Sequence, residues 1–115
     1  MKLDLQEKGD VSILILDGQL AAGGDEMFRE AIDTLLSSNR TKILADFTGV
    51  TFMDSVGIGE LVASFRTVKR FGGALKILKP SKTIQDTLSL TQLLPIFEVF
   101  DDEKSAVASF TTKDY

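Results

Sequence analysis

The sequence contains no cysteine and no histidine in its 115 residues. Without cysteine the chain forms neither disulfides nor thiolate metal sites, and without histidine it lacks the commonest general base and the commonest transition-metal ligand. No apolar run approaches the roughly 20 residues that span a membrane, and the polar N-terminal MKLDLQEKGD is unlike a signal peptide. We therefore expect a cytoplasmic protein with no membrane insertion, no metal site and no cofactor.

Positive charge is also scarce. Thirteen lysines and arginines stand against 17 aspartates and glutamates, so the formal net charge is −4. Nucleic acid requires clustered basic side chains, so direct binding to it is not expected. Hydrophobic residues make up 43% and charged residues 26% of the chain, which is ordinary for a globular protein. The length suits a single domain, predicted over residues 1–115.

Hydrophobic periodicity predicts alternating strands and helices. Strands are expected over 1–5, 11–18, 42–47, 74–78 and within 96–100. Helices are expected over 26–38, from residue 55 to the glycines at 72–73, after Pro80 over 81–93, and over 101–110. The segment TGVTF at 48–52 is predicted as a turn. The order β-β-α-β-α-β-α-β-α indicates an α/β fold with a mixed sheet, because strands joined through helices pair in parallel.

Some residues are assigned to the core or to the surface by this pattern. One face of the helix from residue 55 is expected to be buried, with Ile58, Leu61, Val62, Phe65 and Val68. A set of phenylalanines is also expected in the core: Phe71, Phe97, Phe100 and Phe110. The acidic run at 101–103 is expected to be a solvated helix start, which suits the helix dipole.

The segment TFMDSVGIGEL at 51–61 places a hydroxyl between a buried strand and a helix. Ser55 occupies the position of an N-cap, where a serine oxygen accepts a hydrogen bond from the first turn. The same helix N-terminus also favours phosphate. Gly57 and Gly59 cost helix stability, so they indicate either close packing of the helix on the sheet or clearance for a partner.

Two acidic residues flank the predicted turn. Asp46 and Asp54 could approach Ser55 in space, and with magnesium they would resemble a phosphoryl-transfer site. The sequence has no phosphate-binding loop, and Gly57 and Gly59 alone are too short a match to count as one. Catalysis is therefore not expected, and Asp54 is assigned to loop N–H groups or to capping of the helix.

The segment FMDSVGIGELV, followed by FRTVKRFGGALKIL, resembles the signature of STAS domains, especially the bacterial anti-sigma factor antagonists. The segments LDGQL, ILADFTGVTF and LSLTQLLPIFEVF extend the resemblance over nearly the whole chain. The resemblance implies a STAS-like mixed sheet packed with helices, and it implies a protein that acts by binding and not as an enzyme.

The resemblance also implies a switch. In the family, the unphosphorylated domain captures an anti-sigma factor that is a serine kinase. That kinase phosphorylates the serine after the aspartate, which matches Ser55, and a PP2C-type phosphatase reverses the reaction. The implied partner-binding positions are Asp54, Ser55, Val56, Gly57 and Gly59, together with Gln19 and Ala21.

One segment departs from the family pattern. Where the family has Gly-Glu-hydrophobic-Asp, this chain reads Gly18-Gln19-Leu20-Ala21, so both acids are absent. The departure favours an alternative in which the domain is a non-phosphorylated scaffold subunit, as in lipid-transport ATPase complexes or stress-signalling assemblies. A third class, a binder of nucleotides or other small molecules, also stays open.

Overall fold

The computed structural model describes residues 1–111. Its strands form one sheet in the order β1-β2-β3-β4-β5. The strands are β1 (Lys2–Lys8), β2 (Val11–Leu20), β3 (Lys42–Met53), β4 (Ala74–Leu78) and β5 (Val99–Phe100). The helices are α1 (Asp25–Ser37), α2 (Ser55–Arg70), α3 (Lys82–Leu90) and α4 (Glu103–Ser109), with a 3₁₀ turn, η1 (Leu94–Ile96).

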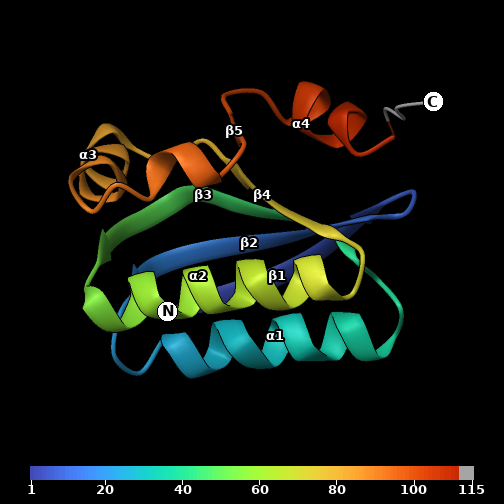
Figure 1. Ribbon diagram of the computed structural model, residues 1–115, viewed down its shortest axis with the longest axis horizontal. Helices are drawn as coiled ribbons and strands as arrows, with labels where there is room; N and C mark the ends of the chain where they lie inside the picture. Colours follow the sequence, from blue (N-terminus) through green and yellow to red (C-terminus); the bar gives the residue numbers. More distant parts are fainter. Residues whose placement is uncertain (112–115) are drawn as a thin grey trace.

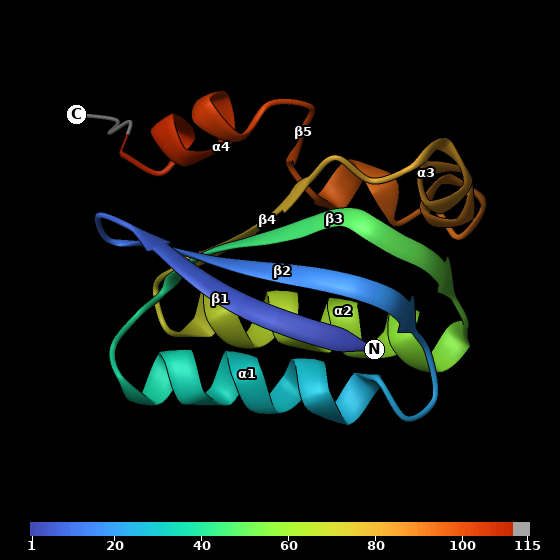
Figure 2. The same ribbon diagram turned by 180° about the vertical axis from the view of Figure 1, so that it is seen from behind.

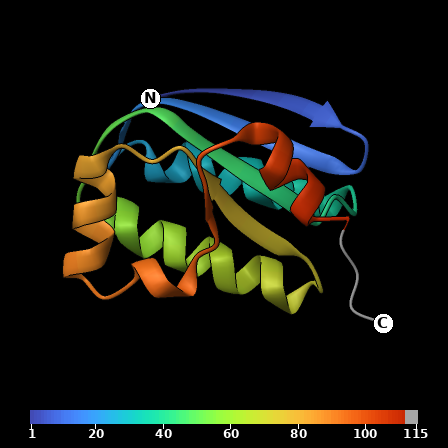
Figure 3. The same cartoon turned by 90° about the horizontal axis from the view of Figure 1, so that it is seen from above.

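The sheet is mixed, as predicted. β1 and β2 form an antiparallel hairpin, and β2, β3, β4 and β5 are parallel to one another. Strands added in one direction through right-handed crossovers keep their helices on one face. Accordingly, α1 and α2 lie side by side under the sheet, while α4 lies over the opposite face (Figures 1 and 2). β1 forms one edge of the sheet (Figure 3).

The alternation of side chains along β2 divides the core between the two faces. Leu14 and Leu16 belong to the larger cluster, which packs against α1 and α2. Val11 and Ile13 belong to the smaller cluster, which α4 covers through Ala106. A strand that is buried on both faces reads as a nearly continuous hydrophobic run, which is why this segment was recognisable in the sequence.

The predicted apolar face of α2 is confirmed. Leu61 and Val68 are fully buried, and the other three members of the set are partly buried against the same cluster. Phe65 meets Phe97 edge to face, with ring centroids 5.0 Å apart. The two helices on this face are also joined by a polar contact, since Glu60 of α2 accepts a hydrogen bond from Arg29 of α1, and Ser64 of α2 donates a hydrogen bond to the same carboxylate.

The phenylalanine prediction is only partly right. Phe97 and Phe110 are buried, and Phe100 is half-buried. Phe71 is 59% exposed, so its assignment to the core is wrong. It is the C-cap of α2, where the chain leaves the helix toward Gly72.

The predicted turn at 48–52 is also wrong. β3 continues through these residues to Met53, paired with the last residues of β2 across two irregularities in register. Val50 and Met53 stay in the core while the residues between them face outward. The strand therefore carries Asp46 about 25 Å along the chain from Asp54, at roughly 3.3 Å per residue.

The C-terminal helices begin at capped positions. Ser81 caps α3 by accepting a hydrogen bond from the Ile84 N–H, at 3.2 Å, so the helix begins two residues after Pro80. Asp102 caps α4 in the same way through the Ser105 N–H, at 2.8 Å, and hydrogen bonding from the Ser105 hydroxyl and N–H holds the pKa of the Asp102 carboxyl below its usual value. The acidic run at 101–103 is thus a solvated helix start, as predicted.

One buried charge fastens α4 to the sheet. Lys76 on β4 is only 7% exposed, and its ammonium donates a hydrogen bond to the Ser109 hydroxyl at 2.8 Å. The same ammonium lies 4.5 Å from the ring centroid of Phe110 and 3.5 Å from a carboxylate oxygen of Glu98. These three partners all lie in the C-terminal segment, so Lys76 holds this segment against the sheet beside the smaller core cluster.

We expect Lys76→Ala to lower the free energy of unfolding by about 2 kcal/mol, because it removes the buried aliphatic stem together with the hydrogen bond and the cation–π contact. Lys76→Met keeps most of the buried volume and removes the charge, so its cost should stay within about 1 kcal/mol. Urea denaturation of both variants measures the difference. Equal losses for the two would mean that the polar contacts of the ammonium, and not the buried volume of the side chain, account for its contribution.

Candidate partner-binding site

The candidate site lies where β3 ends and α2 begins. Ser55 is the first residue of α2, and the sequence-based prediction that it caps the helix is wrong. The N-cap is Asp54, in extended backbone conformation, and its carboxylate accepts a hydrogen bond from the Gly57 N–H at 2.9 Å. Asp54 therefore caps the helix, and Ser55 does not.

Asp54 also binds a second segment of the chain. Its other carboxylate oxygen accepts a hydrogen bond from the N–H of Ala22, at 3.1 Å, in the loop between β2 and α1. The N–H groups of Gly57 and Ala22 hold the pKa of the Asp54 carboxyl below its usual value. One carboxylate thus joins two segments that are 32 residues apart in sequence.

Ser55 is exposed, and its hydroxyl makes no hydrogen bond to any residue in the range 1–111. A serine side chain in this state is accessible to a modifying enzyme. It also projects from the N-terminal end of a 16-residue helix, where the partial positive charge of the helix stabilises an added anion.

The two glycines of α2 have different surroundings. Gly57 is buried, and a β-carbon there would overlap the carbonyl oxygen of Leu20 and lie 2.6 Å from its carbonyl carbon. Gly59 is exposed, and a β-carbon there would have no neighbour within 4 Å. Close packing of helix on sheet therefore explains Gly57, and nothing in the described part of the chain requires Gly59.

The remaining predicted positions lie around the same end of the sheet. Val56 is 44% exposed. Gln19 is exposed near the end of β2, in register with Phe52 of β3. Ala21 is buried, 7% exposed, so its methyl group contributes to packing of the loop and little to the surface.

Sequence reasoning missed one residue of this surface. Phe52 is 49% exposed, beside Gln19 and two residues before Asp54. Its position was assigned to a turn, whereas strand alternation from the buried Met53 would have pointed it outward. The structure thus brings an exposed aromatic ring to the end of the sheet where Ser55 lies.

The magnesium alternative is not supported by the geometry. Asp46 accepts two hydrogen bonds from Thr48, one from its N–H and one from its hydroxyl, and lies far along β3 from Asp54. Within residues 1–111 no group of three or more acidic, histidine or cysteine side chains is arranged to hold a metal ion. The prediction that Asp46 and Asp54 meet at Ser55 is therefore wrong, because the intervening segment is a strand.

The model of the STAS domain family matches residues 2–106, and the chain belongs to this family. A related protein from Paenibacillus polymyxa is named anti-sigma F factor antagonist. It is 21% identical over 108 residues, which cover 93% of this chain and 92% of that protein. None of the helices within residues 1–111 is long and apolar enough to cross a membrane.

Solved structures have the same fold. A Thermotoga maritima protein, 23% identical, superposes with a TM-score of 0.89 over 96% of this chain and 95% of that one. The anti-sigma factor antagonist SpoIIAA in its unphosphorylated form, 22% identical, gives a TM-score of 0.73 over 97% of this chain and 100% of that one. SpoIIAA of Bacillus has also been solved in its phosphorylated form, with a TM-score of 0.74 at 24% identity, over 94% of this chain and 98% of that one.

The contrast between the two glycines gives a matched pair of variants. Gly59→Ala should raise the free energy of unfolding by about 0.5–1 kcal/mol, because alanine favours the helix and meets no neighbour. Gly57→Ala should lower it by about 1–3 kcal/mol, because the methyl group forces α2 away from Leu20. Thermal and urea denaturation distinguish them, and the same sign for both would contradict the packing described.

The lowered pKa of Asp54 gives a prediction about pH. Because the folded value lies below the unfolded one, ionisation of Asp54 stabilises the fold above about pH 4, and this contribution disappears as pH falls through the folded pKa. Asp54→Asn should therefore unfold at lower urea than the wild type at neutral pH, and the gap should close in acid. Asp101→Asn, at an exposed residue that caps no helix, serves as the control and should show no such gap.

Proposed function

We propose that this domain is an anti-sigma factor antagonist, a regulatory binding protein of the cytoplasm that captures an anti-sigma factor of the serine-kinase type. Phosphorylation of Ser55 by that kinase releases the partner, and a PP2C-type phosphatase restores the binding form. The observation that carries the proposal is the exposed, unbonded hydroxyl of Ser55 at the start of α2. The names of related proteins support it.

The geometry supports a switch that leaves the fold intact. Because Asp54 already caps the helix, Ser55 can be modified without loss of a structural hydrogen bond. Phosphorylation adds about −1.5 to −2 charges and three acceptor oxygens. This charge adds to the exposed surface beside Asp54, so its main effect falls on whatever protein docks there.

The proposed docking surface is the exposed part of this end of the sheet. It consists of Ser55, Val56 and Gly59 on α2, with Asp54, Gln19 and the exposed ring of Phe52 beside them. Gly59 fits this role because it costs helix stability, and no residue within 1–111 gives it a packing reason. Gly57 and Ala21 act indirectly, by holding the loop and helix that present this surface.

The first experiment tests phosphorylation itself. The purified protein is incubated with candidate anti-sigma kinases and ATP, and intact mass is recorded. We expect addition of one phosphoryl group to the wild type and none to Ser55→Ala. Ser81→Ala is the matched control, since Ser81 also lies at a helix start but its oxygen is used as the cap. Modification lost in the Ser81 variant, or retained in the Ser55 variant, would contradict the assignment.

The second experiment tests the switch. The wild type, Ser55→Asp and the form carrying phosphoserine at 55 are titrated against the kinase that modifies Ser55. Like charges brought together at the interface should weaken binding by about 10- to 1,000-fold for the phosphorylated form, and in part for Ser55→Asp. Equal affinities for all three would favour the alternative, a scaffold subunit that does not respond to phosphorylation.

Gly59 provides a separate test of the surface. Gly59→Leu adds a side chain where the domain has open space, so the fold should retain its stability. If a partner approaches closely here, its affinity should fall by about tenfold or more, as expected for a clash in a packed interface. Ser89→Leu, at an exposed position of α3, is the control and should bind normally. Unchanged affinity of Gly59→Leu would remove Gly59 from the docking surface.

The two acidic residues of the family pattern are absent at positions 19 and 21, and the two positions must be tested separately because one is exposed and the other is buried. Gln19 is exposed, so Gln19→Glu restores one family charge without disturbing the fold. It should raise affinity if the partner is a standard anti-sigma kinase. Ala21→Asp places a carboxylate at a buried position and should lower the free energy of unfolding by about 1–3 kcal/mol. No gain from Gln19→Glu would indicate a partner with a different charge pattern.

A further inference from the structure

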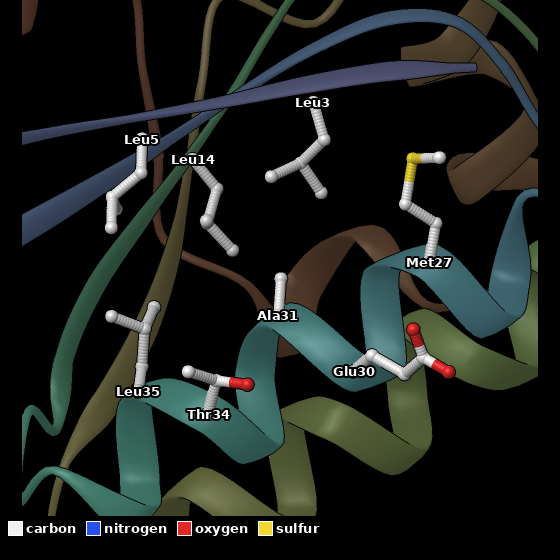
Figure 4. A pocket seen from close by; sticks show the side chains of 8 residues that line it. All are labelled: Leu3, Leu5, Leu14, Met27, Glu30, Ala31, Thr34 and Leu35. Carbon is white, nitrogen blue, oxygen red and sulfur yellow. The ribbon is translucent and has the colours of Figure 1, made fainter.

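An apolar groove lies between β1 and α1, and it shares no residue with the site around Ser55. Its volume is about 400 Å³. The groove is formed mainly by hydrophobic side chains from two strands and one helix: Leu3, Leu5, Leu14, Met27, Ala31 and Leu35. Figure 4 shows the leucines of the strands pointing toward the helix across the opening.

The groove leaves large apolar side chains in contact with water. Leu5 is 48% exposed and Met27 is 42% exposed, one on each side of the opening. Met27 lies on α1 beside the buried Phe28, and its own side chain stands at the rim of the groove. Two exposed apolar side chains on opposite sides of a groove form a hydrophobic patch, and such a patch marks a place where a binding partner can be accommodated.

The strand that borders the groove has an open edge. Among residues 1–111, β1 pairs with β2 and with no other strand, so alternate backbone N–H and C=O groups along its outer side have no strand to bond. Side chains alternate between the two faces of a strand, so Lys2 and Asp4 face away from the groove. On the face of β1 that lines the groove, the first half of the strand therefore carries no charged side chain that would oppose pairing with another chain.

The helix that forms one side of the groove is acidic, and one of its acidic residues, Glu30, lines the groove. α1 carries four acidic residues and one basic residue, Arg29, whose guanidinium is already paired with Glu60. Glu30 stands at the rim of the groove with Thr34 (Figure 4). A protein segment that covers the groove is therefore favoured if it is basic.

These features argue against a second copy of the chain as the molecule that binds in the groove. Two copies related by two-fold symmetry present the same surface to each other, so two acidic α1 helices would meet. An antiparallel pairing of two β1 strands about Leu5 would also place Lys2 opposite Lys8, which is unfavourable. Neither objection applies to a basic partner.

We infer that the groove between β1 and α1 binds an extended segment of another protein. The segment adds to the free edge of β1, places aliphatic side chains against Leu5 and Met27, and pairs a lysine or arginine with Glu30. Main-chain bonds to the strand supply affinity, and the alternate side chains supply specificity. This interface is separate from the Ser55 surface, so both can be occupied at once.

The test uses a defined peptide, acetyl-KTLTVTK-amide, which carries two aliphatic side chains and two lysines on one face of a strand. Titration into isotope-labelled protein should shift the backbone amide signals of β1 and α1 and reach saturation. The peptide acetyl-ETLTVTE-amide has the same aliphatic face with opposite charge, and it should bind at least about fivefold more weakly.

Variants of the protein locate the site. Leu5→Thr and Met27→Gln should each weaken binding of the basic peptide about threefold or more, because both remove apolar contact. Glu30→Lys should weaken it about two- to fivefold, with the effect reduced in high salt. Asp101→Lys makes the same change in net charge directly after β5, at the far edge of the sheet from β1, and should leave binding unchanged.

Three results would overturn the inference. The first is equal binding of the two peptides, or shifts that fall outside β1 and α1. The second is a dimer of the protein alone, seen by sedimentation and abolished by Leu5→Thr, which would assign the groove to a second copy. The third is a response of the same amides to 1-hexanol but not to the basic peptide, which would assign the groove to a small apolar molecule.

Discussion

The candidate site depends on one carboxylate that bonds two segments at once. Asp54 accepts the N–H of Gly57 in the first turn of α2 and the N–H of Ala22 in the loop after β2. The same two segments also touch where Gly57 lies on the Leu20 carbonyl. The start of α2 is thereby fixed against the end of β2, and Ser55 projects from a rigid support.

The chain topology brings these segments together. In parallel strands joined by crossover helices, the carboxyl ends lie at the same edge of the sheet. The ends of β2 and β3 are therefore adjacent, with Leu20 in register with Met53. The loop to α1 and the start of α2 follow directly from these residues. The position of the candidate site is therefore a consequence of strand order.

Much of this fold is readable from the sequence, because the relevant signals are periodic. The apolar stripe of α2, the continuous hydrophobic run of β2 and the order of elements all agree with the structure. The position of the candidate site was predicted from the Asp-Ser-x-Gly-x-Gly pattern, and the structure places that pattern at the start of α2. These features depend on local spacing, so one sequence is sufficient to detect them.

Other features depend on contacts that local spacing does not encode. Either Asp54 or Ser55 suits an N-cap, and only the tertiary contact with Ala22 favours the acid. The turn signal at 48–52 was overridden by pairing with β2. Phe71 is hydrophobic but lies beyond the end of its helix. The groove at Met27 could not be foreseen either, because it depends on where β1 lies relative to α1.

The most direct test of this account is an NMR titration of the Asp54 carboxyl carbon together with the amide protons of Ala22 and Gly57. If the carboxylate binds both N–H groups, all three signals should follow one titration, with a pKa below the ordinary value for aspartate. Both amide protons should move upfield as the carboxyl is protonated, because each loses a charged acceptor. Separate titration curves for the two amides, or an Asp54 pKa at or above the ordinary value, would contradict the central claim.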